Sequence, residues 1–209
     1  MPTAVILLAA GSSSRLGQPK QLLPYEGKTL LRRAAETAVA AAAGAPVVVV
    51  TGALHEELLP ELAGLLVLPV RCTNWALGMG ASLKTGLVAL KSLCNNWDTV
   101  AVMLCDQPHV TTTVIKQLAA TYWHTGQPIV AAEYGAVRGV PVLFGPEVLP
   151  LLQEISDAAG AAQLLKQHPQ LVATVPFAAG AIDVDTPEQY AALLGEGTLP
   201  RSDHKQDSR

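Results

Sequence analysis

Short runs of β-branched and leucine residues recur in the first half of this chain, and each is followed by a segment with helical spacing. The first run is Val5-Ile6-Leu7-Leu8, and unbroken apolar runs of this kind are typical of strands covered on both faces of a sheet. Three further strands are predicted at residues 47–51, 66–72 and 99–104. Helices are predicted between the strands at residues 29–43, 54–62 and 80–93. This alternation predicts an α/β fold with a single doubly wound, mostly parallel sheet.

The second half of the chain has a less regular pattern. A helix is predicted over residues 111–125, and two strands at 129–133 and 140–144 flank Gly135 and Gly139. These two strands predict a small, hairpin-like β excursion. Further helices are predicted at residues 153–167 and 187–194, and a strand at 171–175. We find no internal repeat, so we expect one domain over residues 1–194 and a flexible tail over 195–209.

Composition narrows the class of protein. Half of the 209 residues are hydrophobic, 15% are charged and the formal net charge is −3, which excludes wholesale disorder and argues against a general nucleic-acid or membrane surface. The uncharged stretch 37–54 is divided by Gly44 and Pro46, so we expect a helix and a strand there rather than a membrane span. Three cysteines without a C-x-x-C spacing indicate a reduced, cytoplasmic protein.

The first candidate ligand-binding segment follows the first strand. Residues 8–20 contain Gly11 and Gly17, three consecutive serines and the cations Arg15 and Lys20. Small residues allow a backbone to approach a ligand closely, and consecutive N–H groups can bind an anion. Arg and Lys both suit phosphates. The alternative is a strand-ending turn with two solvated cations, and neither a P-loop nor a nucleophile elbow matches this spacing.

A carboxylate follows the strand at residues 99–104. Ligands of open α/β sheets bind beyond the carboxyl ends of the strands, and Asp106 stands there as a natural Mg²⁺ ligand. Alternatively, Asp106 caps the next helix or forms a turn before Pro108. Its neighbour Cys105 is expected to be a packed thiol rather than a nucleophile.

Two more segments carry candidate ligands. In an extended chain Asp183 and Asp185 point to one face, so one or both could bind a metal, although Asp185 or Thr186 would also start a helix well. Gly78 and Gly80 permit close approach to a base or ribose, and Ser82 adds a small donor and acceptor. The alternative for this segment is a loop leading into a helix, with Ser82 in its first turn.

Together these segments resemble the molybdopterin nucleotidylyltransferases, nearest to the molybdenum cofactor cytidylyltransferase group. The resemblance spans residues 3 to about 194. The matching motifs are Leu8-Ala-Ala-Gly-Ser-Ser-Ser-Arg-Leu-Gly-Gln-Pro-Lys20-Gln-Leu-Leu-Pro24, Asn74-Trp75 through Gly78-Met79 to Ser82, Cys105-Asp-Gln-Pro108, Arg138-Gly-Val-Pro-Val-Leu-Phe144 and Asp183-Val-Asp-Thr-Pro-Glu188. The chain departs from the family pattern at Val140, where a polar residue is common, and at Ala162, where a cation is common.

The resemblance implies a Rossmann-like nucleotidyltransferase fold and a reaction. A phosphate of a molybdopterin-type acceptor attacks the α-phosphate of a nucleoside triphosphate and expels pyrophosphate. By resemblance, the catalytic cations Arg15 and Lys20 hold the triphosphate, and Asp106 and Asp185, with Asp183 as a further candidate, hold Mg²⁺. The nucleotide-binding residues implied are Leu8, Ala9, Ala10, Gly11, Arg15, Lys20, Gly78, Gly80 and Ser82.

The identity of the substrates follows only from the resemblance. The segment Asn74-Trp75 through Gly78-Met79 resembles the cytidylyl group and favours CTP over GTP. A recipient molybdoenzyme is a further expected partner. Two alternatives stay open at this point: transfer to a sugar phosphate or related phosphorylated alcohol, and a non-catalytic carrier of the molybdenum cofactor.

Overall fold

The computed structural model describes residues 2–13, 16–93 and 97–196. Its main feature is a seven-stranded sheet with the strand order β5-β4-β1-β6-β8-β7-β9. The strands are β1 (Thr3–Ala9), β4 (Val47–Thr51), β5 (Leu68–Arg71), β6 (Thr99–Leu104), β7 (Ile129–Tyr134), β8 (Val137–Phe144) and β9 (Val172–Pro176). All neighbours in the sheet are parallel except those of β8, which runs antiparallel to both β6 and β7. The predicted α/β class with a mostly parallel sheet is confirmed.

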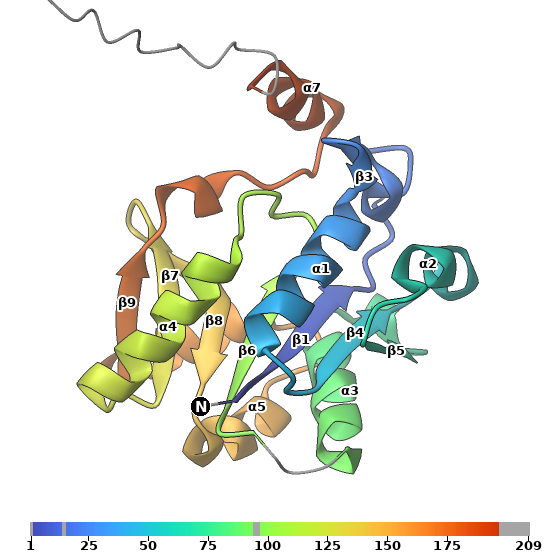
Figure 1. Ribbon diagram of the computed structural model, residues 1–209. Coiled ribbons are helices and arrows are strands. Elements are labelled where there is room, and N and C mark those ends of the chain that lie inside the picture. Colours follow the sequence, from blue (N-terminus) through green and yellow to red (C-terminus); the bar gives the residue numbers. More distant parts are fainter. Residues whose placement is uncertain (1, 14–15, 94–96, 197–209) are drawn as a thin grey trace, which may run out of the picture.

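Helices cover both faces of this sheet (Figure 1). They are α1 (Leu30–Ala42), α2 (His55–Leu62), α3 (Met79–Ser92), α4 (Thr112–Thr125), α5 (Leu149–Glu154), α6 (Ala161–Gln167) and α7 (Pro187–Glu196). Side chains of β1 alternate between two cores: Ile6 and Leu8 pack with α3 and α6, whereas Val5 and Leu7 pack with α1 and α4. Every residue of β1 is buried, because a central strand with helices on both sides has no solvent-facing side.

The uncharged stretch 37–54 forms two elements, as predicted. Helix α1 ends with Ala43 in the left-handed conformation at φ 49°, followed by Gly44, and β4 begins at Val47. Within the described part of the chain, the structure contains no helix that is both long enough and apolar enough to span a bilayer.

Two expectations for the second half need correction or completion, and one small element of the first half was not expected. A single helix was predicted at residues 153–167. The structure instead has two helices, α5 and α6, separated by a loop at residues 155–160. The hairpin β7–β8 is not a separate excursion, because β8 pairs with β6 and continues the main sheet. A small antiparallel pair, β2 (Pro24–Tyr25) and β3 (Lys28–Thr29), was not predicted. The expected tail lies mostly outside the described residues.

Candidate functional site

The site lies where two neighbouring central strands end. Leu8 of β1 pairs with Leu104 of β6, so the segments that follow these strands start side by side at the carboxyl edge of the sheet. A pocket of about 280 Å³ opens there. Its lining residues come from three parts of the chain: Leu8, Ala9, Ala10, Gly11, Ser12, Lys20 and Gln21; Trp75, Ala76, Gly78, Met79 and Ser82; and Leu104, Cys105 and Asp106.

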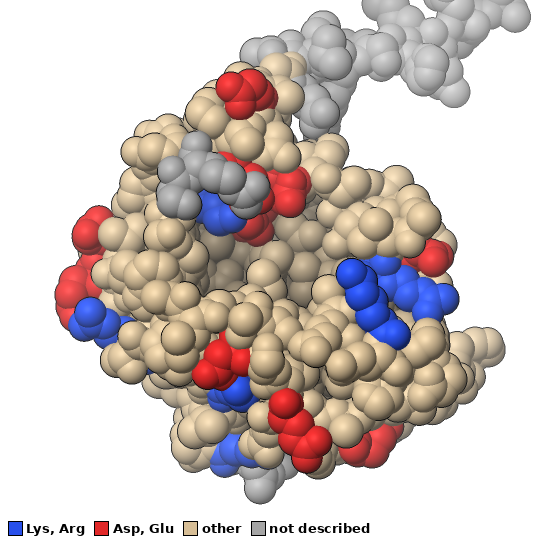
Figure 2. Space-filling model, turned by 180° about the vertical axis from the view of Figure 1, so that it is seen from behind, with Lys and Arg blue, Asp and Glu red and all other residues tan. Residues whose placement is uncertain are grey.

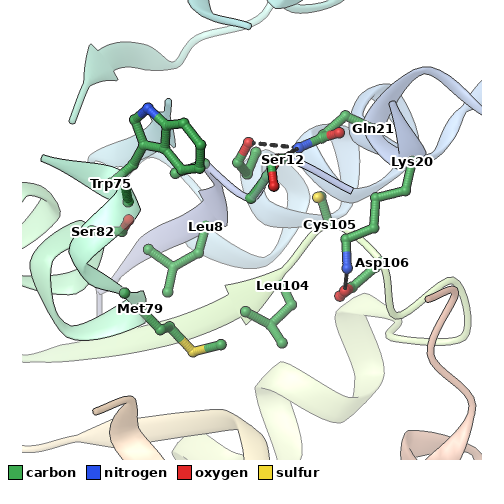
Figure 3. A pocket seen from close by; sticks show the side chains of 15 residues that line it. Leu8, Ser12, Lys20, Gln21, Trp75, Met79, Ser82, Leu104, Cys105 and Asp106 are labelled. Atoms are coloured by element: carbon green, nitrogen blue, oxygen red, sulfur yellow. Dashed lines mark hydrogen bonds and ion pairs between the residues drawn. The ribbon is translucent and has the colours of Figure 1, made fainter. Parts of the chain in front are cut away.

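The pocket has two chemically different sides. Figure 3 shows Trp75, Met79, Leu8 and Leu104 on one side, and Lys20 and Asp106 on the other. The indole of Trp75 offers a flat apolar surface suited to an aromatic ring, whereas the opposite side is ionic. In the space-filling view this face of the molecule is hollowed at its centre, with acidic and basic groups together at the upper rim of the hollow (Figure 2). The arrangement suits a ligand with one apolar and one charged end.

Lys20 is the centre of the charged side. Its ammonium donates to Asp106 Oδ2 and, at 2.7 Å, to Asp185 Oδ1. Burial by itself lowers the pKa of Lys20, but the Asp106 and Asp185 carboxylates outweigh burial and hold that pKa above its ordinary value. Lys20 is therefore a permanent cation held between two carboxylates. The other predicted cation, Arg15, lies outside the described residues.

Asp106 retains a free acceptor. The residue is 8% exposed, and its Oδ1 is buried without a hydrogen-bond partner among the described residues. Burial raises the pKa of Asp106, and the Lys20 ammonium opposes that rise. The alternative role as a helix cap is not observed, because Thr111 caps α4 by accepting from Val114 N.

The two carboxylates fit a divalent cation. Mg²⁺ is commonly bound through one or two carboxylates, with substrate phosphates and water as further ligands, and Asp106 Oδ1 is an oxygen that lacks a partner among the described residues. Over the described ranges there is no cluster of three or more His, Cys, Asp or Glu that could hold a metal. Asp106 and Asp185 are therefore the candidate ligands, and phosphate oxygens would have to supply part of the coordination.

Asp185 reaches the site because a distant segment is pinned against the Asp106 loop. Val184 N donates to Asp106 O at 3.1 Å, and the Val184 side chain is fully buried. Helix α7 then begins as predicted: Thr186 Oγ1 accepts from Gln189 N at 3.3 Å. Asp183 is not brought to Lys20, since its carboxylate accepts from Gln189 Nε2 at 3.1 Å.

Gly78 and Gly80 were both expected to allow close approach of a base or ribose, but the structure places them in different environments. Gly78 lines the pocket, has φ +131° and lies so close to the loop that an added Cβ would be 2.7 Å from Ala158 Cα. Gly80 does not line the pocket; a Cβ there would collide with Ser156 O and lie 3.0 Å from Asp157 O. Because both glycines lack a Cβ, the loop at residues 155–160 can pack closely against them. Ser82 lies in the first turn of α3 and also lines the pocket.

Seven pocket residues were not among the predicted site residues: Ser12, Gln21, Trp75, Ala76, Met79, Leu104 and Cys105. Gln21 is 1% exposed, and a polar residue directly after Lys20 in an otherwise apolar stretch was the available signal. Cys105 also lines the pocket, where burial raises the pKa of its thiol to about 12. A thiol of this kind stays protonated at neutral pH, so Cys105 is a packed residue, as expected.

Comparison with known proteins identifies the family. The family described as "MobA-like NTP transferase domain" matches residues 5–172. The chain belongs to this family. This membership agrees with a pocket that pairs an apolar side with a cation between two carboxylates, and it supports nucleotidyltransferase activity.

Individual relatives of the MobA-like chain carry different names. The chain is 34% identical to nicotine blue oxidoreductase of Paenarthrobacter nicotinovorans, covering 90% of this chain and 95% of that protein. It is 30% identical to the probable molybdenum cofactor guanylyltransferase of Nostoc sp., covering 91% and 90%. Among solved structures, Rv0371c of Mycobacterium tuberculosis in complex with manganese is 25% identical, with a TM-score of 0.72 and coverage of 93% and 99%.

Proposed function

We propose that this protein is a nucleotidylyltransferase that transfers a nucleoside monophosphate to the phosphate of a molybdopterin-type acceptor and releases pyrophosphate. The observation that carries the proposal is the Lys20 ammonium held between Asp106 and Asp185 at the charged end of the pocket. A relative named as a molybdenum cofactor guanylyltransferase supports the acceptor class. The resemblance of the sequence motifs to the molybdopterin nucleotidylyltransferases supports it as well.

In this reaction an oxygen of the acceptor phosphate forms a bond to the α-phosphorus, and the bond from that phosphorus to the β-phosphate oxygen breaks. The attacking oxygen is already anionic, so the site needs no general base. Neutralising and aligning the phosphates is the main task. Lys20 can do this because it stays protonated, and the protonated Cys105 offers no competing nucleophile. A bound divalent cation would supply further charge neutralisation.

Mg²⁺ is the cofactor that we propose, held by Asp106 and Asp185. The free Oδ1 of Asp106 supports this assignment, as does the related mycobacterial protein, whose structure contains manganese. Asp183 is the weaker candidate because Gln189 already engages its carboxylate. A reduced, cytoplasmic location is part of the proposal, supported by the buried free thiols of Cys72 and Cys105.

CTP is the nucleotide that we propose, with GTP as its competitor. The segment from Asn74 to Met79 supports CTP by resemblance, whereas relatives named guanylyltransferases support GTP. Trp75 can stack on either base. A recipient molybdoenzyme remains a proposed partner for the product.

Pyrophosphate release tests the proposal. Purified protein, Mg²⁺ and molybdopterin are incubated with CTP, GTP, ATP or UTP, and pyrophosphate is measured with and without the acceptor. Acceptor-dependent release with CTP is the expected result. Release with GTP and no other nucleotide would show that GTP is the substrate, and the proposed reaction would stand. Pyrophosphate release that occurs only when a sugar phosphate takes the place of molybdopterin would show that the acceptor is a sugar phosphate. Binding of the molybdenum cofactor without nucleotide and without pyrophosphate release would indicate a carrier.

A further inference from the structure

Gln21 lies at the junction of the nucleotide pocket and the Lys20 cluster. It is next to Lys20 in a short 3₁₀ turn, Lys20–Leu22, and is 1% exposed. Its Nε2 donates to Ala9 O at 3.0 Å and to Gly11 O at 2.7 Å. Both amide protons are therefore used on the loop that leaves β1, and Figure 3 shows the side-chain nitrogen directed toward that loop.

A serine fixes the other end of the same side chain. Ser13 Oγ donates to Gln21 Oε1 at 3.2 Å and accepts from Lys20 N at 3.0 Å. Ser13 has φ +55°, an uncommon conformation for a residue other than glycine. All hydrogen-bonding positions of the Gln21 amide except one lone pair are thus occupied, so its orientation is determined.

The remaining carbonyl oxygens of the loop are also turned away from a ligand. Leu8 O accepts from Cys105 N at 3.3 Å. Ala10 O lies against Gly52, where a side chain would collide with it. By contrast, the amides of Ala10, Gly11 and Ser12 donate to no residue in the described ranges, although all three residues line the pocket. Residues 10–12 therefore offer amide donors, and the carbonyl oxygens of residues 8–11 are engaged or packed away.

We propose that Gln21 is a positioning residue for polyphosphate binding: by holding the carbonyls of Ala9 and Gly11, it leaves the amides of residues 10–12 as the groups that this loop presents to an anion. Consecutive backbone N–H groups form an anion-binding concavity. The inference rests on the proposed function and deepens it. It assigns the amides of residues 10–12 to the phosphates, because the carbonyls of residues 8–11 are engaged or packed away and leave these amides as the free backbone groups there.

Affinity for Mg²⁺-tripolyphosphate, a probe without base or ribose, tests the inference. We expect Gln21→Glu and Gln21→Met to weaken tripolyphosphate and CTP by the same factor, about 10-fold or more, which corresponds to ~1.4 kcal/mol. The ratio of CTP to GTP affinity should stay constant. Gln18→Leu is the matched control, because Gln18 is exposed in the same connection, and it should change neither affinity.

The outcomes are distinguishable. A folded Gln21 variant, verified by circular dichroism, that binds tripolyphosphate like the wild type overturns the inference and leaves the proposed function intact. A change in the CTP to GTP ratio with unchanged tripolyphosphate affinity overturns it in favour of base recognition. Wild-type protein that binds neither ligand overturns both. Ser13→Ala removes one anchor of the same amide without touching the core, so a smaller parallel loss is expected if the Gln21 variants fail to fold.

Discussion

Replacing Lys20 by methionine tests the charged centre through its effect on folding. Lys20, Asp106 and Asp185 have side-chain exposures of 15%, 11% and 24%. Removing one partner of a buried ion pair costs about 3–5 kcal/mol. Because water reaches part of this cluster, we expect Lys20→Met to lower the free energy of unfolding by about 3 kcal/mol at pH 8. The buried Asp106 carboxylate is then left without its cation.

The cost should depend on pH in one direction. Without Lys20, the largest opposition to the burial that raises the pKa of Asp106 is lost and only a backbone hydrogen bond still lowers that pKa, so the folded variant binds a proton more tightly than the unfolded chain does. That contribution is fully present below the unfolded pKa of about 3.8 and is lost as pH rises through the folded pKa. A tenfold change in the proton affinity of this carboxylate corresponds to about 1.4 kcal/mol. The difference in stability between wild type and variant should therefore be smaller at pH 5 than at pH 8.

Urea unfolding at pH 5 and pH 8 measures both effects. The second variant Lys20→Met/Asp106→Asn should recover stability at pH 8, since it removes the uncompensated charge, and the exposed Lys91→Met serves as the control. Pyrophosphate release should remain at least about 100-fold below wild type in both Lys20 variants. Equal stability of Lys20→Met and wild type at both pH values would refute the ion-paired centre.

Three shorter predictions follow from other contacts. Cys105, whose pKa burial raises to about 12, should resist alkylation by iodoacetamide at pH 8.5 in folded protein and react after unfolding, as read by peptide mass spectrometry; equal labelling would contradict the packing. The stability that its protonated form confers is present below pH 9 and is lost as pH rises toward 12. Gly80→Ala should lower stability by about 1–3 kcal/mol, because its Cβ collides with Ser156 O; an unchanged melting temperature would show that the 155–160 loop moves freely. Asp185→Asn should weaken Mg²⁺-dependent nucleotide binding about 10-fold in a calorimetric titration, whereas Asp183→Asn should change it less than about 2-fold. A larger loss for Asp183→Asn than for Asp185→Asn would make Asp183 the metal ligand instead.

The central strands and the position of the site follow from local pattern. The strands at residues 47–51 and 99–104 were predicted with the observed bounds, because a strand covered on both faces must be continuously apolar. The carboxyl ends of β1 and β6 then determine where Gly11, Lys20 and Asp106 lie. The sequence order of strands and helices is enough for this inference.

Long-range contacts could not be predicted in the same way. The pairing of Lys20 with Asp185 depends on how the buried Val184 docks, and the 153–167 prediction failed because helical spacing continues across the loop at residues 155–160. That loop is fixed by partners on α3, where Lys84 Nζ donates to Ile155 O at 3.1 Å and pairs with Asp157. Such partners are distant in sequence, so periodicity carries no signal of them.

The contact between Val184 N and Asp106 O has a consequence for the newly made chain. Protein synthesis proceeds from the N-terminus at about 5–20 residues per second, so β1, β4 and β6 with their helices leave the ribosome before the segment that carries Asp185. The Lys20 ammonium then has only one of its two carboxylates. The charged centre, in which Lys20 contacts both Asp106 and Asp185, can therefore be completed only after the segment that carries Asp185 has been synthesised.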